Sequence, residues 1–162
     1  NKLSFFSVSV NAYFASVASD FIRKKLLQSK TSFSFETVMS FNDKIELLKL
    51  AQQQGFRTYL YYVATEAPEI NISRVQSRDH TGGHNVPTDK IKERYYRSLS
   101  LLHEALAYTN RAYFFDNSGS GAIWLAEMND AKQCILKTKQ TPNWFNNYVL
   151  TYLDTDLALM NQ

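Results

Sequence analysis

A nearly unbroken run of apolar and aromatic residues from Arg57 to Ala64 limits the folds open to this chain. Such a run is typical of a strand that is covered on both faces, as in a parallel sheet. A second strand is predicted at Ser32 to Val38, where two phenylalanines alternate with small polar residues. Between them, a helix capped by Asp43 runs to Gln54, and Gly55 supplies its left-handed stop. Strand, helix and strand in succession predict a parallel sheet with a right-handed crossover, and therefore the α/β class.

Further helices and strands are predicted along the rest of the chain from hydrophobic periodicity and turn residues. The predicted helices are Ala12 to Leu27, one from Ala67 that breaks around Thr81-Gly82-Gly83, a long one that begins at Pro87, and Trp144 to Leu153. The predicted strands are Ala112 to Phe115, a neighbour at Ala122 to Glu127, and Cys134 to Leu136.

Composition bounds the class of protein and its partners. The 162 residues, 44% of them hydrophobic, are enough for the core of one domain, so we expect a single domain over 1–162. A net charge of +3 is too slight to indicate nucleic-acid binding. No apolar run approaches the roughly 18 residues that a membrane span needs. The single cysteine, Cys134, cannot form an internal disulfide, so we expect a reducing, cytoplasmic location. From the slight charge and the lack of a long apolar run, we expect neither a nucleic-acid nor a membrane partner.

Arg74 and Arg78 are the most distinctive candidates for chemistry. They are four residues apart, so on a helix their guanidinium groups lie on one face and could hold phosphate oxygens together. Gly82 and Gly83 follow closely and would let the segment hinge. A mobile flap that carries arginines suits phosphoryl transfer, which needs charge neutralisation and the exclusion of water. An ordinary surface helix with a flexible turn is the alternative that the spacing leaves open.

Two pairs of polar residues follow predicted strands, where open α/β sheets bind their ligands. Glu36 and Thr37 could bind a substrate hydroxyl or a magnesium-bound water, although a carboxylate there could equally cap the next helix. Asp116 and Asn117 follow the third strand, where the alternative is a plain turn. His80 and His84 have no third ligand at zinc-site spacing, and we predict no metal site in the chain.

Four stretches in this order resemble zeta-toxin-type P-loop kinases, over roughly Asn11 to Leu153. They are Ser32-Phe-Ser-Phe-Glu36-Thr37-Val-Met-Ser40, Asn71-Ile-Ser-Arg74-Val-Gln-Ser-Arg78 with Gly82-Gly83-His84-Asn-Val86-Pro87, Arg94-Tyr95-Tyr96-Arg97-Ser98-Leu99, and Phe115-Asp116-Asn117-Ser118. The combination is specific, whereas no one stretch is.

The resemblance implies a P-loop kinase-like three-layer fold with a mostly parallel sheet, a helical lid at about 69–98 and a C-terminal extension at about 122–162. It implies that ATP or GTP with Mg²⁺ donates a phosphoryl group to a small-molecule hydroxyl, such as that of a nucleotide-activated sugar. By position, Arg74 and Arg78 look like the lid arginines that contact the phosphates, and Arg94 like a further nucleotide contact. Glu36 and Thr37 look like acceptor-side residues, and Asp116 and Asn117 fall near the nucleotide base. An antitoxin protein is a further partner that the family suggests.

The chain departs from the family pattern in one respect. It contains no Gly-x-x-x-x-Gly-Lys-Ser/Thr stretch, and its five glycines cannot form one. The aspartate that such kinases carry after the P-loop helix is also missing. In the family these parts precede the matching segments, so the chain looks like the C-terminal portion of a kinase. We expect this portion to be inactive alone. We also expect an exposed groove, or a partner that fills it, where the central P-loop strand would lie in the sheet. The alternative is a catalytically degenerate module that binds a nucleotide or a partner.

Overall fold

The chain divides into two units, residues 1–36 and 37–162, of which a computed structural model describes residues 12–79, 86–130 and 132–153. The first unit contains helix α1 (Ala12–Gln28), as its amphipathic pattern predicts. The helix ends in a Schellman motif, in which Thr31 N–H bonds to Leu26 O at 3.0 Å around Lys30 in the left-handed region (φ 56°). In the extended segment that follows, the Phe35 ring lies 5.1 Å from the Arg23 guanidinium.

The strand predicted at Ser32 to Val38 is wrong. Within the described ranges, no strand forms backbone hydrogen bonds with this segment, and its alternating pattern leads only to an extended chain. A strand requires a neighbour for its N–H and C=O groups, which alternation alone cannot supply. At the start of the second unit, Thr37 Oγ1 instead accepts a hydrogen bond from Met39 N–H at 3.2 Å, and Met39 has a φ of 53°.

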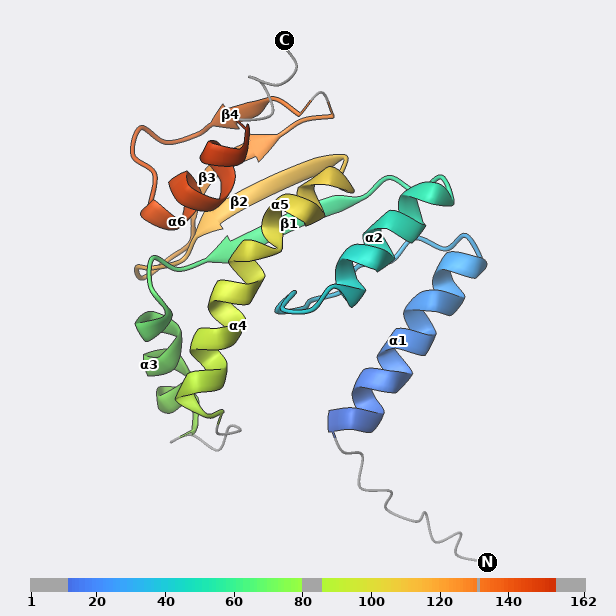
Figure 1. The fold of residues 1–162 in the computed structure, drawn as a ribbon, viewed down its shortest axis with the longest axis horizontal. Coiled ribbons are helices and arrows are strands. Elements are labelled where there is room, and N and C mark those ends of the chain that lie inside the picture. The colour runs from blue at the N-terminus through green and yellow to red at the C-terminus, as the bar shows by residue number, and fades with distance from the viewer. Residues whose placement is uncertain (1–11, 80–85, 131, 154–162) are drawn as a thin grey trace, which may run out of the picture. The chain divides into compact units, whose positions relative to one another are not determined.

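Within the described residues, the sheet of the second unit has four strands in the order β1-β2-β3-β4 (Figure 1). They are β1 (Tyr59–Ala64), β2 (Arg111–Asp116), β3 (Ile123–Met128) and β4 (Cys134–Leu136). Only β1 and β2 are parallel, while β2/β3 and β3/β4 are antiparallel. The prediction of a mostly parallel sheet is therefore wrong, because the loops that join β2 to β3 and β3 to β4 are too short for a parallel crossover.

The helices of the second unit follow the predicted order, but both the helix predicted from Pro87 and the one predicted over Trp144 to Leu153 are divided. The observed helices are α2 (Asp43–Gln53), α3 (Pro68–Asp79), α4 (Thr88–Ser100), α5 (Leu102–Ala107), α6 (Asn143–Phe145) and the π-helical turn η1 (Asn146–Leu150). The cap predicted at Asp43 is wrong, because Asn42 holds the N-cap position of α2 without a side-chain hydrogen bond. Gly55, at φ 84°, ends α2 as predicted: its N–H bonds to Gln52 O at 2.9 Å. The long helix predicted from Pro87 is interrupted at Leu101 and forms α4 and α5. The diglycine, His80 and His84 lie outside the described residues.

The hydrophobic core lies on one face of the sheet, under α4, α5 and α6 (Figure 1). Alternate residues of β2 point into it, because successive side chains of a strand point to opposite faces. Its fully buried members include Ile45, Leu102, Phe114, Phe145 and Val149. Phe114 and Phe145 meet edge to face, with ring centroids 5.3 Å apart. This contact fixes α6 on the sheet.

The opposite face of the sheet is exposed and aromatic. On β1, Tyr59, Tyr61 and Val63 are 49%, 64% and 55% exposed, and Tyr61 stacks on Tyr113 of β2 at 4.8 Å. The prediction that β1 is covered on both faces is therefore wrong. Among the described strands, β1 also has a neighbour on one edge alone. The expectation that the sheet lacks the P-loop strand stays a prediction.

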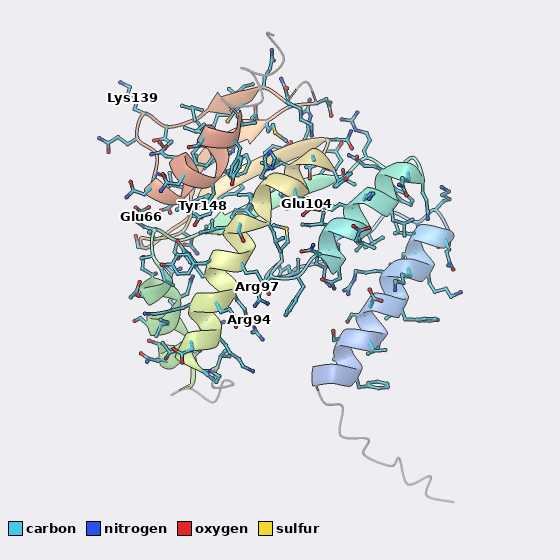
Figure 2. The ribbon with its side chains drawn as sticks, viewed as in Figure 1. Glu66, Arg94, Arg97, Glu104, Lys139 and Tyr148 are labelled. Carbon is cyan, nitrogen blue, oxygen red and sulfur yellow. The ribbon has the colours of Figure 1, made fainter. Side chains whose placement is uncertain are left out.

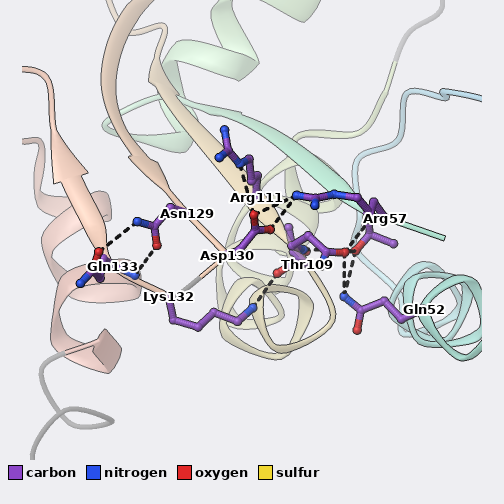
Figure 3. A network of polar contacts seen from close by, with 10 residues as sticks. Gln52, Arg57, Thr109, Arg111, Asn129, Asp130, Lys132 and Gln133 are labelled. Carbon is purple, nitrogen blue, oxygen red and sulfur yellow. Dashed lines mark hydrogen bonds and ion pairs between the residues drawn. The ribbon is translucent and has the colours of Figure 1, made fainter. Parts of the chain in front are cut away.

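Ion pairs and hydrogen bonds stabilise the end of the sheet at which β1 and β2 begin (Figure 3). The Asp130 carboxylate accepts two hydrogen bonds from Arg57, both of 2.9 Å, and lies 3.7 Å from Arg111. Lys132 Nζ donates to the carbonyls of Leu106 and Thr109, both at 2.6 Å, and so satisfies the end of α5. Burial at this position lowers the pKa of Lys132. These contacts join the β3–β4 turn to the helix and strands.

Candidate functional site

The carboxyl ends of β1 and β2 meet at one edge of the sheet, because the two strands are parallel and in register from Tyr59↔Arg111 to Ala64↔Asp116. Asn117 N–H continues the pairing by donating to Ala64 O at 2.7 Å. The segments that follow the two strands therefore begin side by side, at the end of the sheet where α/β proteins bind their ligands.

Asp116 ends β2 with its carboxylate turned into the protein. The side chain is 8% exposed and accepts hydrogen bonds from Trp144 Nε1 at 3.0 Å, Ser118 Oγ at 2.8 Å and Ser118 N–H at 3.2 Å. Ser118 Oγ in turn accepts a hydrogen bond from Glu66 N–H at 2.7 Å. Asn117 is half-buried at the turn between them. These bonds fix the turn that follows β2.

Glu66 holds the other strand end in place. Its carboxylate accepts hydrogen bonds from the Asn143 backbone N–H, at 3.0 Å to Oε2, and from the Asn143 side-chain amide. Helix α3 begins only two residues later, at Pro68. The start of α3 and the start of α6 are therefore joined by one carboxylate. Figure 2 shows Glu66 below α6, at the point where the chain enters α3.

Arg74 reaches from α3 to the turn after β2. This half-buried residue donates from a terminal guanidinium nitrogen to Gly119 O at 3.1 Å. A guanidinium has five N–H donors, and this bond uses one of them. Arg78 lies one helical turn farther along α3 and is exposed. The structure thus brings Arg74 close to the turn that contains Asp116 and Asn117. All three residues were predicted from the sequence as site residues.

Helix α4 packs beside α3 and is tied to the same strand end. Tyr95 Oη donates to Thr65 O at 2.7 Å, and Lys92 forms an ion pair with Glu69 of α3 at 3.1 Å. Burial, and then the nearby negative charge of Glu66, raise the pKa of Tyr95 well above its ordinary range. The two helices are therefore anchored to each other and to the carboxyl end of β1.

Arg94 and Arg97 project from the same side of α4 (Figure 2). Arg94 is exposed, whereas Arg97 is ion-paired with Glu93 and lies 5.1 Å from the centre of the Phe41 ring. This cation–π contact attaches residues 37–42 to the helix. Arg94 lies on a different element from Arg74.

Glu36 and Thr37 are exposed and fall on the two sides of the division between the units. Glu36 ends the first unit and Thr37 begins the second. Glu36 thus belongs to a different unit from the one that contains the strand-end site. The acceptor-side role of the pair stays a prediction.

Three contributors to the site were missed from the sequence: Glu66, Ser118 and Trp144. Glu66 and Ser118 each lie two residues beyond the last residue of a parallel strand, so the strand-end rule that selected Asp116 could have found them. No pattern in the sequence indicates Trp144, because its indole N–H contacts Asp116 from a helix that is 28 residues away in sequence.

The described part of the chain contains no group of three or more His, Cys, Asp and Glu side chains that could hold a metal ion. Among its helices, none has both the length and the apolar character that crossing a bilayer requires.

Comparisons with known proteins confirm the resemblance in the motifs. The family model described as Zeta toxin matches residues 7–128. A protein of Haemophilus influenzae, described as uncharacterized, is 33% identical over 69 residues, which are 43% of this chain and 49% of that protein. The match thus spans about half the length of this relative. No solved structure matches the chain. Since the family model covers well over half of the residues, the chain belongs to the zeta toxin family.

Proposed function

We propose that the intact protein is a nucleotide-dependent phosphotransferase that acts on a small-molecule hydroxyl, and that this chain supplies its lid and strand-end turn. The zeta toxin family suggests a P-loop kinase-like fold and chemistry that uses a nucleotide and Mg²⁺. The single observation that carries the proposal is the contact of Arg74 with Gly119 O at 3.1 Å. This contact supports the proposal because it holds a guanidinium close to the carboxyl ends of the parallel strands, and a transferring phosphoryl group needs positive charge.

The residues take the following parts in the proposal. Arg74 and Arg78 neutralise the charge of the phosphates, and Arg94 adds a nucleotide contact from α4. Asn117 lies beside the base, while Asp116 acts through the turn that it holds, because its buried carboxylate already accepts three protein hydrogen bonds. Glu36 and Thr37 bind the acceptor. The nucleotide, ATP or GTP, brings Mg²⁺ that shields its phosphates when bound.

The acceptor and the biological setting are also proposals. The family resemblance favours a nucleotide-activated sugar as acceptor and an antitoxin protein as partner. A reducing, cytoplasmic location fits the single free cysteine, Cys134, which is half-buried.

The proposal is tested by Arg74→Ala in the full-length protein, with transfer of labelled γ-phosphate to nucleotide-activated sugars as the assay. We expect kcat/KM to fall about 10²–10³-fold, as for the loss of one donor to a transition-state charge. Arg57→Ala is the matched control, because this arginine pairs with Asp130 at the opposite edge of the sheet. The control should leave activity unchanged.

Two outcomes would contradict the proposal. Unchanged turnover in folded Arg74→Ala would reject the lid assignment. Nucleotide binding without any transfer by the wild-type full-length protein would favour the catalytically degenerate binding module.

A further inference from the structure

The strand-end turn belongs to a closed ring of hydrogen bonds that joins three distant segments. Trp144 Nε1 bonds to Asp116, Asp116 to Ser118, and Ser118 Oγ to Glu66 N–H, at 3.0, 2.8 and 2.7 Å. The Glu66 carboxylate accepts from the N–H of Asn143, which precedes Trp144 in the chain and closes the ring. The ring thus links the end of β1, the end of β2 and the start of α6.

The bond between Trp144 and Asp116 is shielded from water, whereas the bonds from Asn143 to Glu66 are exposed. Trp144 is 2% and Asp116 8% exposed. The Trp144 indole packs on Tyr62, with ring centroids 5.8 Å apart, and meets Phe145 edge to face. Hydrogen bonds removed from water are stronger and more costly to break, so the indole N–H holds the Asp116 carboxylate in one orientation.

The ring also lies next to both partners of the hydrogen bond that Arg74 makes, the Gly119 carbonyl and the helix α3 that contains Arg74. Gly119, whose carbonyl accepts the Arg74 hydrogen bond, directly follows Ser118. Glu66 stands two residues before Pro68, the first residue of the helix that carries Arg74. A shift of Ser118 moves the acceptor of this bond, and a shift of Glu66 moves its donor.

Helix α6 lies outside the part of the chain that matches the family, residues 7–128. We propose that Trp144, through Asp116 and Glu66, is a positioning residue that sets the strand-end turn and Arg74 for phosphoryl transfer. The inference rests on the proposed function for the catalytic consequence, but its geometric part can be tested without turnover.

The test uses Trp144→Phe in the full-length protein, which keeps an aromatic ring and removes the indole N–H. We expect the amides of Glu66 and Ser118 to exchange hydrogen about tenfold faster by NMR, and kcat/KM for phosphotransfer to fall about tenfold. Trp124→Phe is the matched control, because it also removes an indole hydrogen bond, to Ala126 O at 3.0 Å, but on β3. It should change neither quantity.

A double-mutant cycle separates positioning from a general loss of stability. If Trp144 acts through Arg74, Trp144→Phe should cost little further activity in an Arg74→Ala background. Glu66→Ala should reproduce the faster exchange at Ser118 without disturbing the aromatic core. Glu66→Gln should largely restore the wild-type rate, because its amide oxygen can still accept from Asn143.

The outcomes are distinguishable. Exchange that stays at the wild-type rate in Trp144→Phe and Glu66→Ala would overturn the ring as a positioning device. Activity losses that multiply with Arg74→Ala would overturn its action through that arginine. A wild-type full-length protein without phosphotransfer would instead overturn the proposed function and, with it, the catalytic consequence of the ring, whatever the exchange rates show.

Discussion

Tyr62 illustrates how a single polar group is accommodated in the core. Its ring is packed against Trp144, and its hydroxyl is hydrogen-bonded to Ser98 at 3.0 Å. Burial raises the pKa of Tyr62 to about 12, with the Ser98 hydrogen bond opposing the shift. The neutral hydroxyl is therefore favoured in the folded state, and ionisation is easier once the chain unfolds.

This shift predicts alkaline destabilisation. Because the unfolded chain loses the proton near its ordinary pKa of 10.0 and the folded chain only near 12, stability is full below pH 10 and falls as the pH rises toward 12. Tyr62→Phe should remove about 1 kcal/mol of the loss between pH 9 and pH 11, measured by urea unfolding at each pH. Tyr61→Phe, on the exposed face, is the control. An equally steep pH dependence in Tyr62→Phe would contradict the prediction.

Residue-level signals in the sequence found part of the site. Arg74 was selected by its spacing from Arg78, and Asp116 and Asn117 by their place after a strand, and the structure brings these segments together. The buried setting of Asp116 could not be predicted, because Trp144 reaches it through tertiary packing and not through any local pattern.

Among the elements, α2 shows the clearest link between a sequence signal and its structure. Gly55 ends the helix at φ 84°, and a Cβ at this position would meet no atom within 4 Å. Lack of space is therefore not the reason for a glycine there. The reason is the backbone conformation, because the left-handed region is energetically unfavourable for L-residues with a side chain.

We predict that Gly55→Ala destabilises the protein by about 1 kcal/mol, measured as the free energy of unfolding in urea. Gly121→Ala is a matched control, because a Cβ there also meets no atom within 4 Å and the backbone does not lie in the left-handed region. Equal stability of the two variants would show that α2 can end without the left-handed residue.

The elements also show why topology was harder to predict than their existence. The strands β2, β3 and β4 lie where turn residues and apolar runs placed them. The pairing of the strands depends on partners elsewhere in the chain, so the segment 32–38 has the pattern of a strand but no ladder. The same holds for β1, whose apolar run predicts two covered faces, although one is exposed.

On the scale of the whole molecule, the buried core cluster belongs to one unit. All of its members lie between Met39 and Val149, within residues 37–162. None of the described residues 12–36 is a member of the cluster, although Leu27 of the first unit is itself only 1% exposed. The buried cluster that stabilises the sheet and its helices is therefore formed by residues of the second unit.

This distribution predicts that residues 37–162 unfold cooperatively when expressed alone. The expected observation is a single thermal transition, followed by near-ultraviolet circular dichroism, which reports the packing of Trp144. Phe145→Ala in the same shortened chain should abolish or strongly lower the transition, because it removes a fully buried ring. A broad transition without near-ultraviolet signal in the unmutated 37–162 chain would contradict the prediction.

The ring of hydrogen bonds also has a consequence for the order of events during synthesis. Both parallel strands leave the ribosome well before Asn143 and Trp144 do, so the turn at Asp116 forms first without its indole partner. Chains emerge from their amino terminus at a limited rate, and contacts distant in sequence close late. A nascent chain would thus contain Arg74 and its acceptor loop, yet hold them loosely until α6 had been made. The site would therefore reach its final arrangement only after α6, near the end of the described part of the chain, has been translated.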